Sequence, residues 1–222
     1  MGTAPVAVRE QDLALARRAA GGERAAQRDL FVAQRAPVHH TLFRILGANR
    51  ELEDLVQDTF VEIYRGLAAF RGDSTLTRWC QTIAARTAYL ALNRRKPTAV
   101  GLELVEAYLA GDDESRRHAQ LREAARRLYA ALDRLDPKQR ITFALAVLDG
   151  CAIAEVAQLT ESSTITVKAR GWRARKELRK RAAGDAVLGS YLAELEAGAD
   201  PQAREARLGA PAIEALPDLS WA

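Results

Sequence analysis

The sequence predicts an all-α fold divided into two small helical domains. Apolar residues recur every three or four positions along most of the 222-residue chain, which is typical of helices with one buried face. No alternating or β-branched stretch is long enough to predict a strand. Proline, glycine and acidic residues interrupt the helical pattern after Pro97. We therefore expect a flexible linker over residues 97–118, between one domain at 1–96 and another at 119–182.

The first domain contains several short helical segments. Glycines at positions 21 and 22 and a proline at position 37 interrupt its beginning. These breaks predict three helices, over residues 12–20, 23–34 and 38–46. A helix of about five turns follows from Glu51, because one apolar stripe runs along it and acidic residues occupy its other side. The last helix follows the loop at Phe70, with Asp73 or Ser74 as its N-terminal cap, and Pro97 stops it.

Helical spacing resumes at Arg116 and continues to Leu135. The next helix begins at Asp136-Pro137, since proline is favoured in a first turn, and Asp149-Gly150 closes it. Two more helices, over 152–159 and 163–181, are joined by a three-residue turn, and Ser163 or Thr164 caps the second. Helices joined by so short a turn indicate a helix-turn-helix. Residues 183–222 form an acidic tail with a short helical stretch at 187–196, and we expect this tail to be loosely ordered.

The net charge of +4 conceals blocks of opposite sign. Residues 1–96 carry 15 basic and 10 acidic groups, residues 135–182 carry 10 and 5, and residues 183–222 carry 2 and 7. Eight of the basic groups fall within fourteen positions, 168–181, of the last helix of the helix-turn-helix. That density favours neutralisation of nucleic-acid phosphates over an ordinary solvated helix face.

The second helix of a helix-turn-helix lies in the major groove of DNA. Exposed polar and basic side chains near its start read bases and contact phosphates. The sequence supplies such residues in the expected place, and they form the predicted DNA-contacting set: Ser163, Thr164, Thr166, Lys168, Arg170, Arg173, Arg175 and Lys176.

Motifs in both domains resemble extracytoplasmic-function (ECF) sigma factors, which belong to the sigma-70 family of bacterial transcription initiation factors. In the second domain the segments 154–157, 166–170 and 173–178 resemble region 4 of that family. In the first domain Asp54–Phe60 with Tyr64 resembles region 2.2, and Phe70–Trp79 resembles region 2.3. The resemblance covers roughly residues 12–96 and 120–181, in the family's order.

The resemblance implies that the first domain contacts both RNA polymerase and DNA. Region 2.2 docks on the clamp of core RNA polymerase, which implies a polymerase-binding set with exposed parts of the aromatic residues as anchors: Asp54, Leu55, Gln57, Asp58, Phe60, Glu62 and Tyr64. Region 2.3 and the helix after it recognise and melt the minus-ten element of promoter DNA, which implies a second set: Arg71, Asp73, Ser74, Thr75, Arg78, Trp79, Arg86, Asn93, Arg94 and Arg95. Trp79 also falls on the apolar stripe of its helix, so its spacing favours the core.

The same resemblance assigns the minus-thirty-five element to the helix-turn-helix and implies an anti-sigma factor that holds the free protein. The second domain departs from the family pattern at three positions. Glu161 stands where relatives usually place the turn glycine, Ile165 where a small residue is common, and Gly171 where an apolar side chain normally faces inward. We expect an altered turn, and we expect Trp172 to repack into the gap at Gly171.

The sequence argues against catalysis and against a membrane location. No histidine pairs with a cysteine or carboxylate at ligand spacing, and no phosphate-binding glycine loop or nucleophile motif occurs, so we expect neither a metal nor a cofactor nor an enzyme. Cys80 and Cys151 stand alone, which is typical of a reducing compartment. No apolar run is long enough to cross a bilayer, so we expect a cytoplasmic protein without membrane insertion.

Two other functions remain open at this point. A stand-alone helix-turn-helix repressor or activator would use the first domain for dimerisation or ligand sensing. A sigma-like interaction module would bind a partner or polymerase without directing initiation, and only the departures in the second domain favour it. We also expect the acidic tail to fold back on the basic helix and weaken DNA binding.

Overall fold

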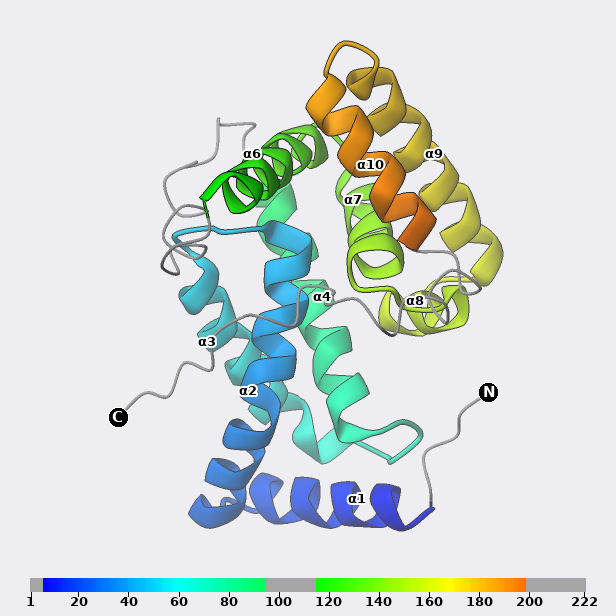
Figure 1. The fold of residues 1–222 in the computed structure, drawn as a ribbon. Coiled ribbons are helices and arrows are strands. Elements are labelled where there is room, and N and C mark those ends of the chain that lie inside the picture. Colours follow the sequence, from blue (N-terminus) through cyan, green and yellow to red (C-terminus); the bar gives the residue numbers. More distant parts are fainter. Residues whose placement is uncertain (1–5, 95–114, 199–222) are drawn as a thin grey trace.

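The structure, a computed structural model, describes residues 6–94 and 115–198 (Figure 1). Every regular element within those residues is helical. The first domain comprises α1 (Val6–Ala20), α2 (Arg24–Leu46), α3 (Leu52–Gly66), the 3-10 turn η1 (Leu67–Ala69) and α4 (Leu76–Arg94). The second comprises α6 (Ser115–Leu132), α7 (Pro137–Phe143), the π-helical turn η2 (Ala144–Leu148), α8 (Ile153–Leu159), α9 (Thr164–Ala182) and α10 (Ala186–Gly198). None of the helices described is both long and apolar enough to cross a membrane.

The long helix α2 forms the centre of the first domain and corrects one prediction. Two helices separated at Pro37 were expected, yet α2 continues through this residue. An interior proline removes one helical hydrogen bond and normally costs about 3 kcal/mol. Buried residues on both sides of it, including Leu30 and Val38, pack against α1, α3 and α4. This tertiary packing holds the two parts of α2 in one helix.

The N-terminus of α4 is capped by residues that the sequence did not indicate. Neither Asp73 nor Ser74 accepts a hydrogen bond from its first turn. The Leu76 N–H donates instead to Oδ2 of Asp12 on α1, at 2.7 Å, and the Arg78 N–H donates to Oγ1 of Thr75, at 3.2 Å. The carboxylate of Asp12 therefore joins α1 to the start of α4.

The second domain confirms the predicted helix start at Asp136-Pro137 and the predicted cap at Ser163. The Asp136 carboxylate accepts from the backbone N–H groups of Lys138 and Gln139, with Pro137 in the first turn of α7. The Ser163 hydroxyl accepts from the backbone N–H of Thr166 at the start of α9. The prediction of a loosely ordered tail is wrong for α10, because two of its leucines are buried against α6 and α9; the rest of the tail, 199–222, lies outside the described residues.

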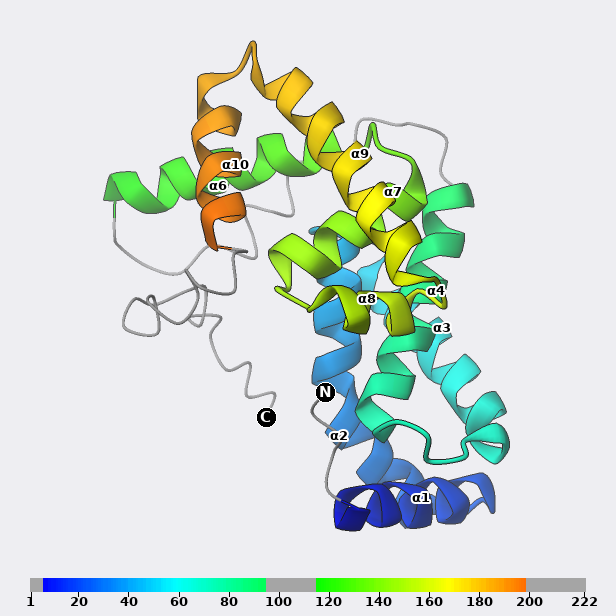
Figure 2. The same ribbon diagram turned by 90° about the vertical axis from the view of Figure 1, so that its right-hand side faces the viewer.

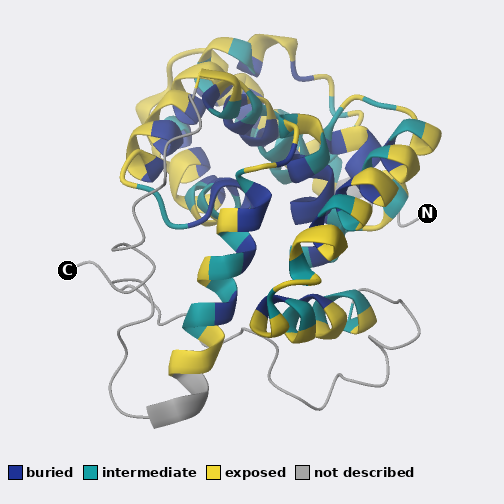
Figure 3. Ribbon diagram, turned by 90° about the horizontal axis from the view of Figure 1, so that it is seen from above, coloured by how far each residue is buried: buried dark blue, intermediate teal, exposed yellow. Residues whose placement is uncertain are grey.

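The two domains pack against each other over a shared apolar core. Ile141, Leu145 and Val156 of the second domain belong to the same buried cluster as residues of α2 and α4. Figure 2 shows α8 beside α4, in agreement with the contacts between these helices. Seen from above, buried residues line the inner sides of the helices and exposed residues the outer sides (Figure 3).

The C-terminal end of α2 meets the second domain through polar contacts. The buried guanidinium of Arg140 donates from Nε to the Ile45 carbonyl at 2.7 Å and from Nη2 to the Leu46 carbonyl at 2.9 Å. A helix ends with backbone carbonyls that lack intrahelical partners, and Arg140 satisfies two of them. Gly47 follows with a left-handed φ of 75°, and an added Cβ would lie only 2.7 Å from the ring of Tyr129. Glycine is therefore required here for both conformation and space.

Candidate functional site

The outer face of α3 carries an acidic ridge, which we define as Asp54, Asp58 and Glu62 with Gln57 among them. All four side chains are exposed. Two apolar members of the polymerase-binding set belong to the core, because Leu55 is buried and Phe60 is only 4% exposed; the expectation that part of Phe60 is exposed is wrong. Tyr64 is half-buried, and its hydroxyl donates to the Gln27 carbonyl at 3.0 Å.

Two exposed apolar residues beside the acidic ridge were missed by the sequence analysis. Val61 lies on α3 between Asp58 and Glu62 and is 45% exposed. Phe31 on α2 is 38% exposed, and its ring packs 4.6 Å from that of Phe60, centroid to centroid. The position of Val61 outside the apolar stripe was a usable signal. The exposure of Phe31 depends on how α2 and α3 pack, which the sequence does not state.

The loop before α4 rests on an aromatic base. The Phe70 and Trp79 rings lie 5.5 Å apart, centroid to centroid, and a Cβ added at Gly66 would lie 3.2 Å from the Trp79 ring. Trp79 is half-buried, so the core position indicated by its spacing is correct in part. Arg71 and Asp73 are exposed on the loop, whereas Ser74 and Thr75 are half-buried. The loop thus presents one cation and one carboxylate over a fixed apolar support.

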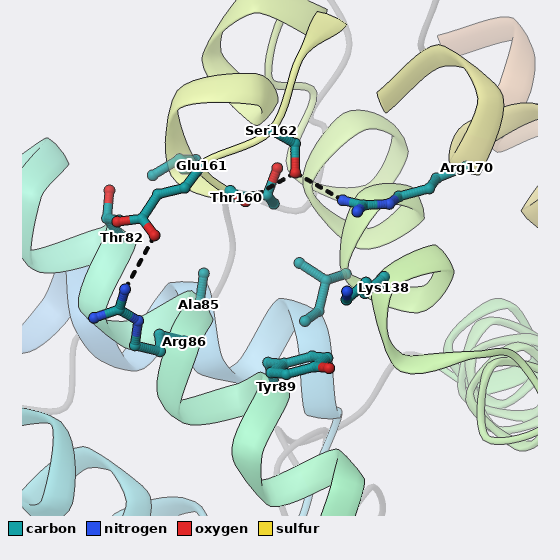
Figure 4. Close-up of a pocket in the computed structure, with 11 residues that line it drawn as sticks. Thr82, Ala85, Arg86, Tyr89, Lys138, Thr160, Glu161, Ser162 and Arg170 are labelled. Carbon is teal, nitrogen blue, oxygen red and sulfur yellow. Dashed lines mark hydrogen bonds and ion pairs between the residues drawn. The ribbon is translucent and has the colours of Figure 1, made fainter. Parts of the chain in front are cut away.

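The cations of α4 make contacts that the sequence did not indicate. Nη2 of Arg78 lies 2.6 Å from Oε1 of Glu155 on α8, and Nη2 of Arg86 lies 3.0 Å from Oε2 of Glu161 in the turn (Figure 4). Both partners belong to the second domain. Asn93 and Arg94 are exposed at the end of α4, and Arg95 lies outside the described residues. Two predicted minus-ten contacts are therefore paired with carboxylates of the helix-turn-helix.

The helix-turn-helix consists of α8, a turn at 160–163 and α9. Glu161 adopts the left-handed φ of 46° in this turn, the only non-glycine residue among those described to have a positive φ. The expectation that its side chain would alter the turn is thus wrong in one respect, because Glu161 takes the conformation that glycine prefers. Nη1 of Arg170 donates to the Ser162 hydroxyl at 2.8 Å and ties α9 to the turn.

The residues predicted to touch DNA lie mainly on the outer face of α9. The exposed members are Ser163, Thr164, Lys168, Arg173 and Lys176. Thr166, Arg170 and Arg175 are half-buried. The Thr166 hydroxyl lies 2.9 Å from that of Ser163, within the helix cap. The exposed members give α9 a cationic outer surface.

The expectation for Trp172 is wrong. Its side chain is 62% exposed and does not fill the space at Gly171; the Lys176 ammonium lies 5.1 Å from the centroid of its ring. Gly171 is buried where α9 crosses α7, and an added Cβ would lie 3.8 Å from Cγ2 of Thr142 and 3.3 Å from Nη1 of Arg175. Close approach of these neighbours leaves no gap for an indole ring.

Helix α10 covers one side of α9 with an acidic contact. Glu196 lies 2.6 Å from Nη2 of Arg179 and 3.8 Å from Nε of Arg175. Asp185 accepts the backbone N–H of Leu188 and pairs with Arg127 at 2.9 Å, which fixes the start of α10 on α6. Part of the acidic tail therefore contacts the basic helix, and it pairs with Arg175 of the predicted DNA-contacting set.

A cavity of about 290 Å³ lies between the domains, lined by α4, α7, the turn and α9 (Figure 4). Its cations are already engaged: Arg86 with Glu161, Arg170 with Ser162, and Lys138 over the Tyr89 ring at 5.7 Å. The cavity contains no cysteine or histidine. It lacks the paired nucleophile and base that covalent catalysis requires.

The two cysteines are unsuited to nucleophilic chemistry. Burial, together with a nearby carboxylate, Asp12 for Cys80 and Asp149 for Cys151, raises the pKa of both thiols to about 12. Because the thiolate is the reactive form, both groups remain protonated near neutral pH. Over residues 6–94 and 115–198, no cluster of three histidine, cysteine or acidic side chains could hold a metal ion.

Two protein families match separate parts of the chain. Residues 30–98 match the family described as Sigma-70 region 2, and residues 125–178 match Sigma-70, region 4. Helix α1 and helix α10 lie outside these two matches.

The similarity to curated relatives covers most of the length of those relatives. The ECF RNA polymerase sigma-E factors of Salmonella typhimurium and Escherichia coli are each 30% identical to this chain over 137 residues, which is 58% of this chain and 72% of theirs. The RNA polymerase sigma-H factor of Pseudomonas aeruginosa is 29% identical over 180 residues, covering 77% and 93%. Among solved structures, CnrH in complex with the cytosolic domain of CnrY matches with a TM-score of 0.53 and 26% identity, covering 78% of this chain and 98% of that one. The chain therefore belongs to the sigma-70 family, among the ECF sigma factors.

Proposed function

We propose that this chain is a cytoplasmic, non-catalytic initiation factor that brings core RNA polymerase to its own promoters and opens them. The observation that carries the proposal is the presence on one chain of an exposed acidic ridge on α3, a cationic outer surface on α9, and exposed arginines before and at the end of α4, Arg71 and Arg94. A stand-alone regulator of the helix-turn-helix type would leave the acidic ridge without a role. An interaction module would leave the cations of both domains without one.

The acidic ridge suits a basic partner surface on core polymerase. Its four polar and charged side chains are exposed along one face of α3 and have the charge to steer association. Val61 and Phe31 lie beside them and supply the apolar anchor that Phe60, being buried, does not. An apolar anchor within a polar rim is the usual anatomy of a protein interface.

Promoter binding by both domains requires the contact between α4 and the helix-turn-helix to open. The minus-ten and minus-thirty-five elements are named for positions about 25 base pairs apart, which corresponds to about 85 Å of duplex at about 3.4 Å per base pair. Arg86 and Glu161 are joined at 3.0 Å, so the two DNA-binding surfaces adjoin each other in the closed arrangement. On the promoter, Arg78 and Arg86 exchange their carboxylate partners for phosphates. The closed arrangement is therefore the form of the free protein.

An anti-sigma protein is the expected partner of that free form. The solved structure of CnrH, which this chain resembles over 78% of its length, contains the cytosolic domain of CnrY as a partner. By analogy, a partner of this chain would cover the acidic ridge or the cationic face of α9. Either surface, once covered, is closed to polymerase or to DNA.

Run-off transcription with core polymerase tests the proposal. Addition of the purified chain is expected to produce new promoter-specific transcripts, and Asp54→Lys/Asp58→Lys is expected to reduce core binding at least tenfold. Glu194→Lys on exposed α10 serves as the control for charge alone. Sequence-specific DNA binding without core would favour the stand-alone regulator, and core binding without transcripts would favour the interaction module; either result would overturn the proposal.

A further inference from the structure

The outer face of α9 carries an apolar ridge, defined as Ile165, Ala169 and Trp172. Ile165 is 78% exposed and Trp172 is 62% exposed, and Ala169 between them is exposed as well. These positions are separated by four and three residues, so their side chains share one face of the helix. Single exposed apolar residues are common on protein surfaces, but three in a row on the cationic helix call for a physical account.

The apolar ridge cannot be explained by packing within the described chain. The inward face of α9 is formed by Val167, Gly171, Ala174 and Leu178, all of them buried. Helix α10 meets α9 at Arg175 and Arg179, which are ten or more residues further along the helix than Ile165. The apolar ridge therefore remains available to an external partner.

Charge identifies that partner as duplex DNA. Lys168, Arg173 and Lys176 are exposed on the same side of α9 and flank the apolar ridge. The carboxylate nearest to the start of the helix, Glu161, is paired with Arg86 on α4. Thymine presents a C5-methyl group in the major groove, and apolar side chains read it by contact.

We propose that Ile165 determines sequence specificity by contacting a thymine methyl group in the minus-thirty-five element. The inference rests on the proposed function and deepens it. Ile165 occupies the first turn of α9, and the N-terminal residues of a recognition helix reach the base edges. Ala169 follows one turn later and leaves room for the groove wall to approach.

Trp172 has a different role on the same face. It lies two turns from the N-terminus of α9, where a recognition helix leaves the groove floor and approaches the sugar-phosphate backbone. Lys176 lies over its ring and carries a charge suited to a phosphate. Trp172 therefore contributes affinity without sequence preference, while Ile165 contributes preference.

A methyl-deletion cycle tests the proposal with the full chain on core polymerase. A randomised minus-thirty-five element is first selected for transcription, and each thymine of the preferred sequence is then replaced by uracil, which lacks only the methyl group. One such replacement is expected to weaken wild-type binding about fourfold, the factor that corresponds to burial of one methyl group. In Ile165→Ala the same replacement is expected to have an effect below 1.5-fold. Val187→Ala, which alters an exposed apolar residue of α10, is the matched control and should behave as wild type.

The outcomes separate this inference from the proposed function. If no promoter is selected, the proposed function fails. If promoters are selected but every uracil replacement weakens wild type and Ile165→Ala equally, the inference on Ile165 is overturned while the proposed function stands. Trp172→Ala is expected to weaken binding to all selected sequences alike, and Trp172→Phe to retain most of it. A change of sequence preference in Trp172→Ala would contradict the division of roles.

Discussion

Among the charged side chains that link the two domains in the described residues, Arg140 is the most deeply buried. It is 2% exposed, donates to the Ile45 and Leu46 carbonyls, and pairs with Asp133. Arg140→Met retains much of the apolar volume while it removes the guanidinium. The last two carbonyls of α2 and the Asp133 carboxylate then lose their partner.

The contacts of Arg140 set the expected loss in free energy of unfolding for Arg140→Met. A hydrogen bond to a charged group contributes about 1.5–3 kcal/mol, and removing one partner of a buried ion pair costs about 3–5 kcal/mol. Asp133 is partly exposed and can regain water, so the loss is expected at about 4 kcal/mol in free energy of unfolding, near the middle of that range. For a chain of this size, the loss corresponds to a fall in Tm of roughly 10 °C.

Urea unfolding followed by circular dichroism measures this loss. Arg134→Met, which alters an exposed arginine of the same segment, is the control and should change stability by less than about 0.5 kcal/mol. Loss of the interdomain contact is also expected to split the transition into two, since each domain then unfolds on its own. A single transition within about 1 kcal/mol of wild type would refute the assignment of Arg140 as the link between the domains.

Three further predictions concern the turn, pH and the acidic contact on α9. Glu161→Gly is expected to raise the free energy of unfolding by up to about 1 kcal/mol, because glycine adopts the positive φ without strain and the exposed ion pair with Arg86 contributes little. A urea titration measures this change, and a loss of stability above about 1 kcal/mol would show that the ion pair dominates. Burial lowers the pKa of His39 and His40 below 6.5, so the unfolded chain binds protons first as the pH falls, and stability present above about pH 6.5 is lost below it. The Tm is therefore expected to be lower at pH 5.5 than at pH 7.5, and this difference is expected to be smaller in His40→Gln than in wild type. His40 faces the charged groups of Arg44 and Asp149. If wild type and His40→Gln show the same difference in Tm, groups other than His40 cause it. Glu196→Gln removes the carboxylate that pairs with Arg175 and Arg179. It is expected to strengthen DNA binding a few-fold and to make the dependence of affinity on salt concentration steeper. An unchanged dependence on salt would mean that these two cations do not reach phosphates.

The sequence predicted the elements whose signals are local. The helix start at Asp136-Pro137, the cap at Ser163, the short turn between α8 and α9, and the acidic face of α3 depend on residues that are close together in the chain. Local hydrogen bonds and helical spacing are sufficient to place such features.

Features that depend on distant residues could not be predicted in this way. Pro37 lies within a helix because the packing of α2 on three other helices outweighs a local preference. The cap of α4 comes from Asp12, more than sixty residues earlier in the chain. Phe60 is buried by packing within the first domain, and Trp172 stays exposed while Thr142 and Arg175 occupy the space beside Gly171. Among the candidate DNA contacts, only tertiary structure shows that Arg78 and Arg86 meet carboxylates of the other domain.

Promoter opening tests the central claim most directly. A selected promoter fragment with 2-aminopurine in its minus-ten element reports the unstacking of that base as a rise in fluorescence. With core polymerase and this chain together we expect the rise, and with either one alone we expect none. If core polymerase and the chain bind the fragment together while the fluorescence stays at the level of duplex DNA, the chain does not act as an initiation factor that opens promoters.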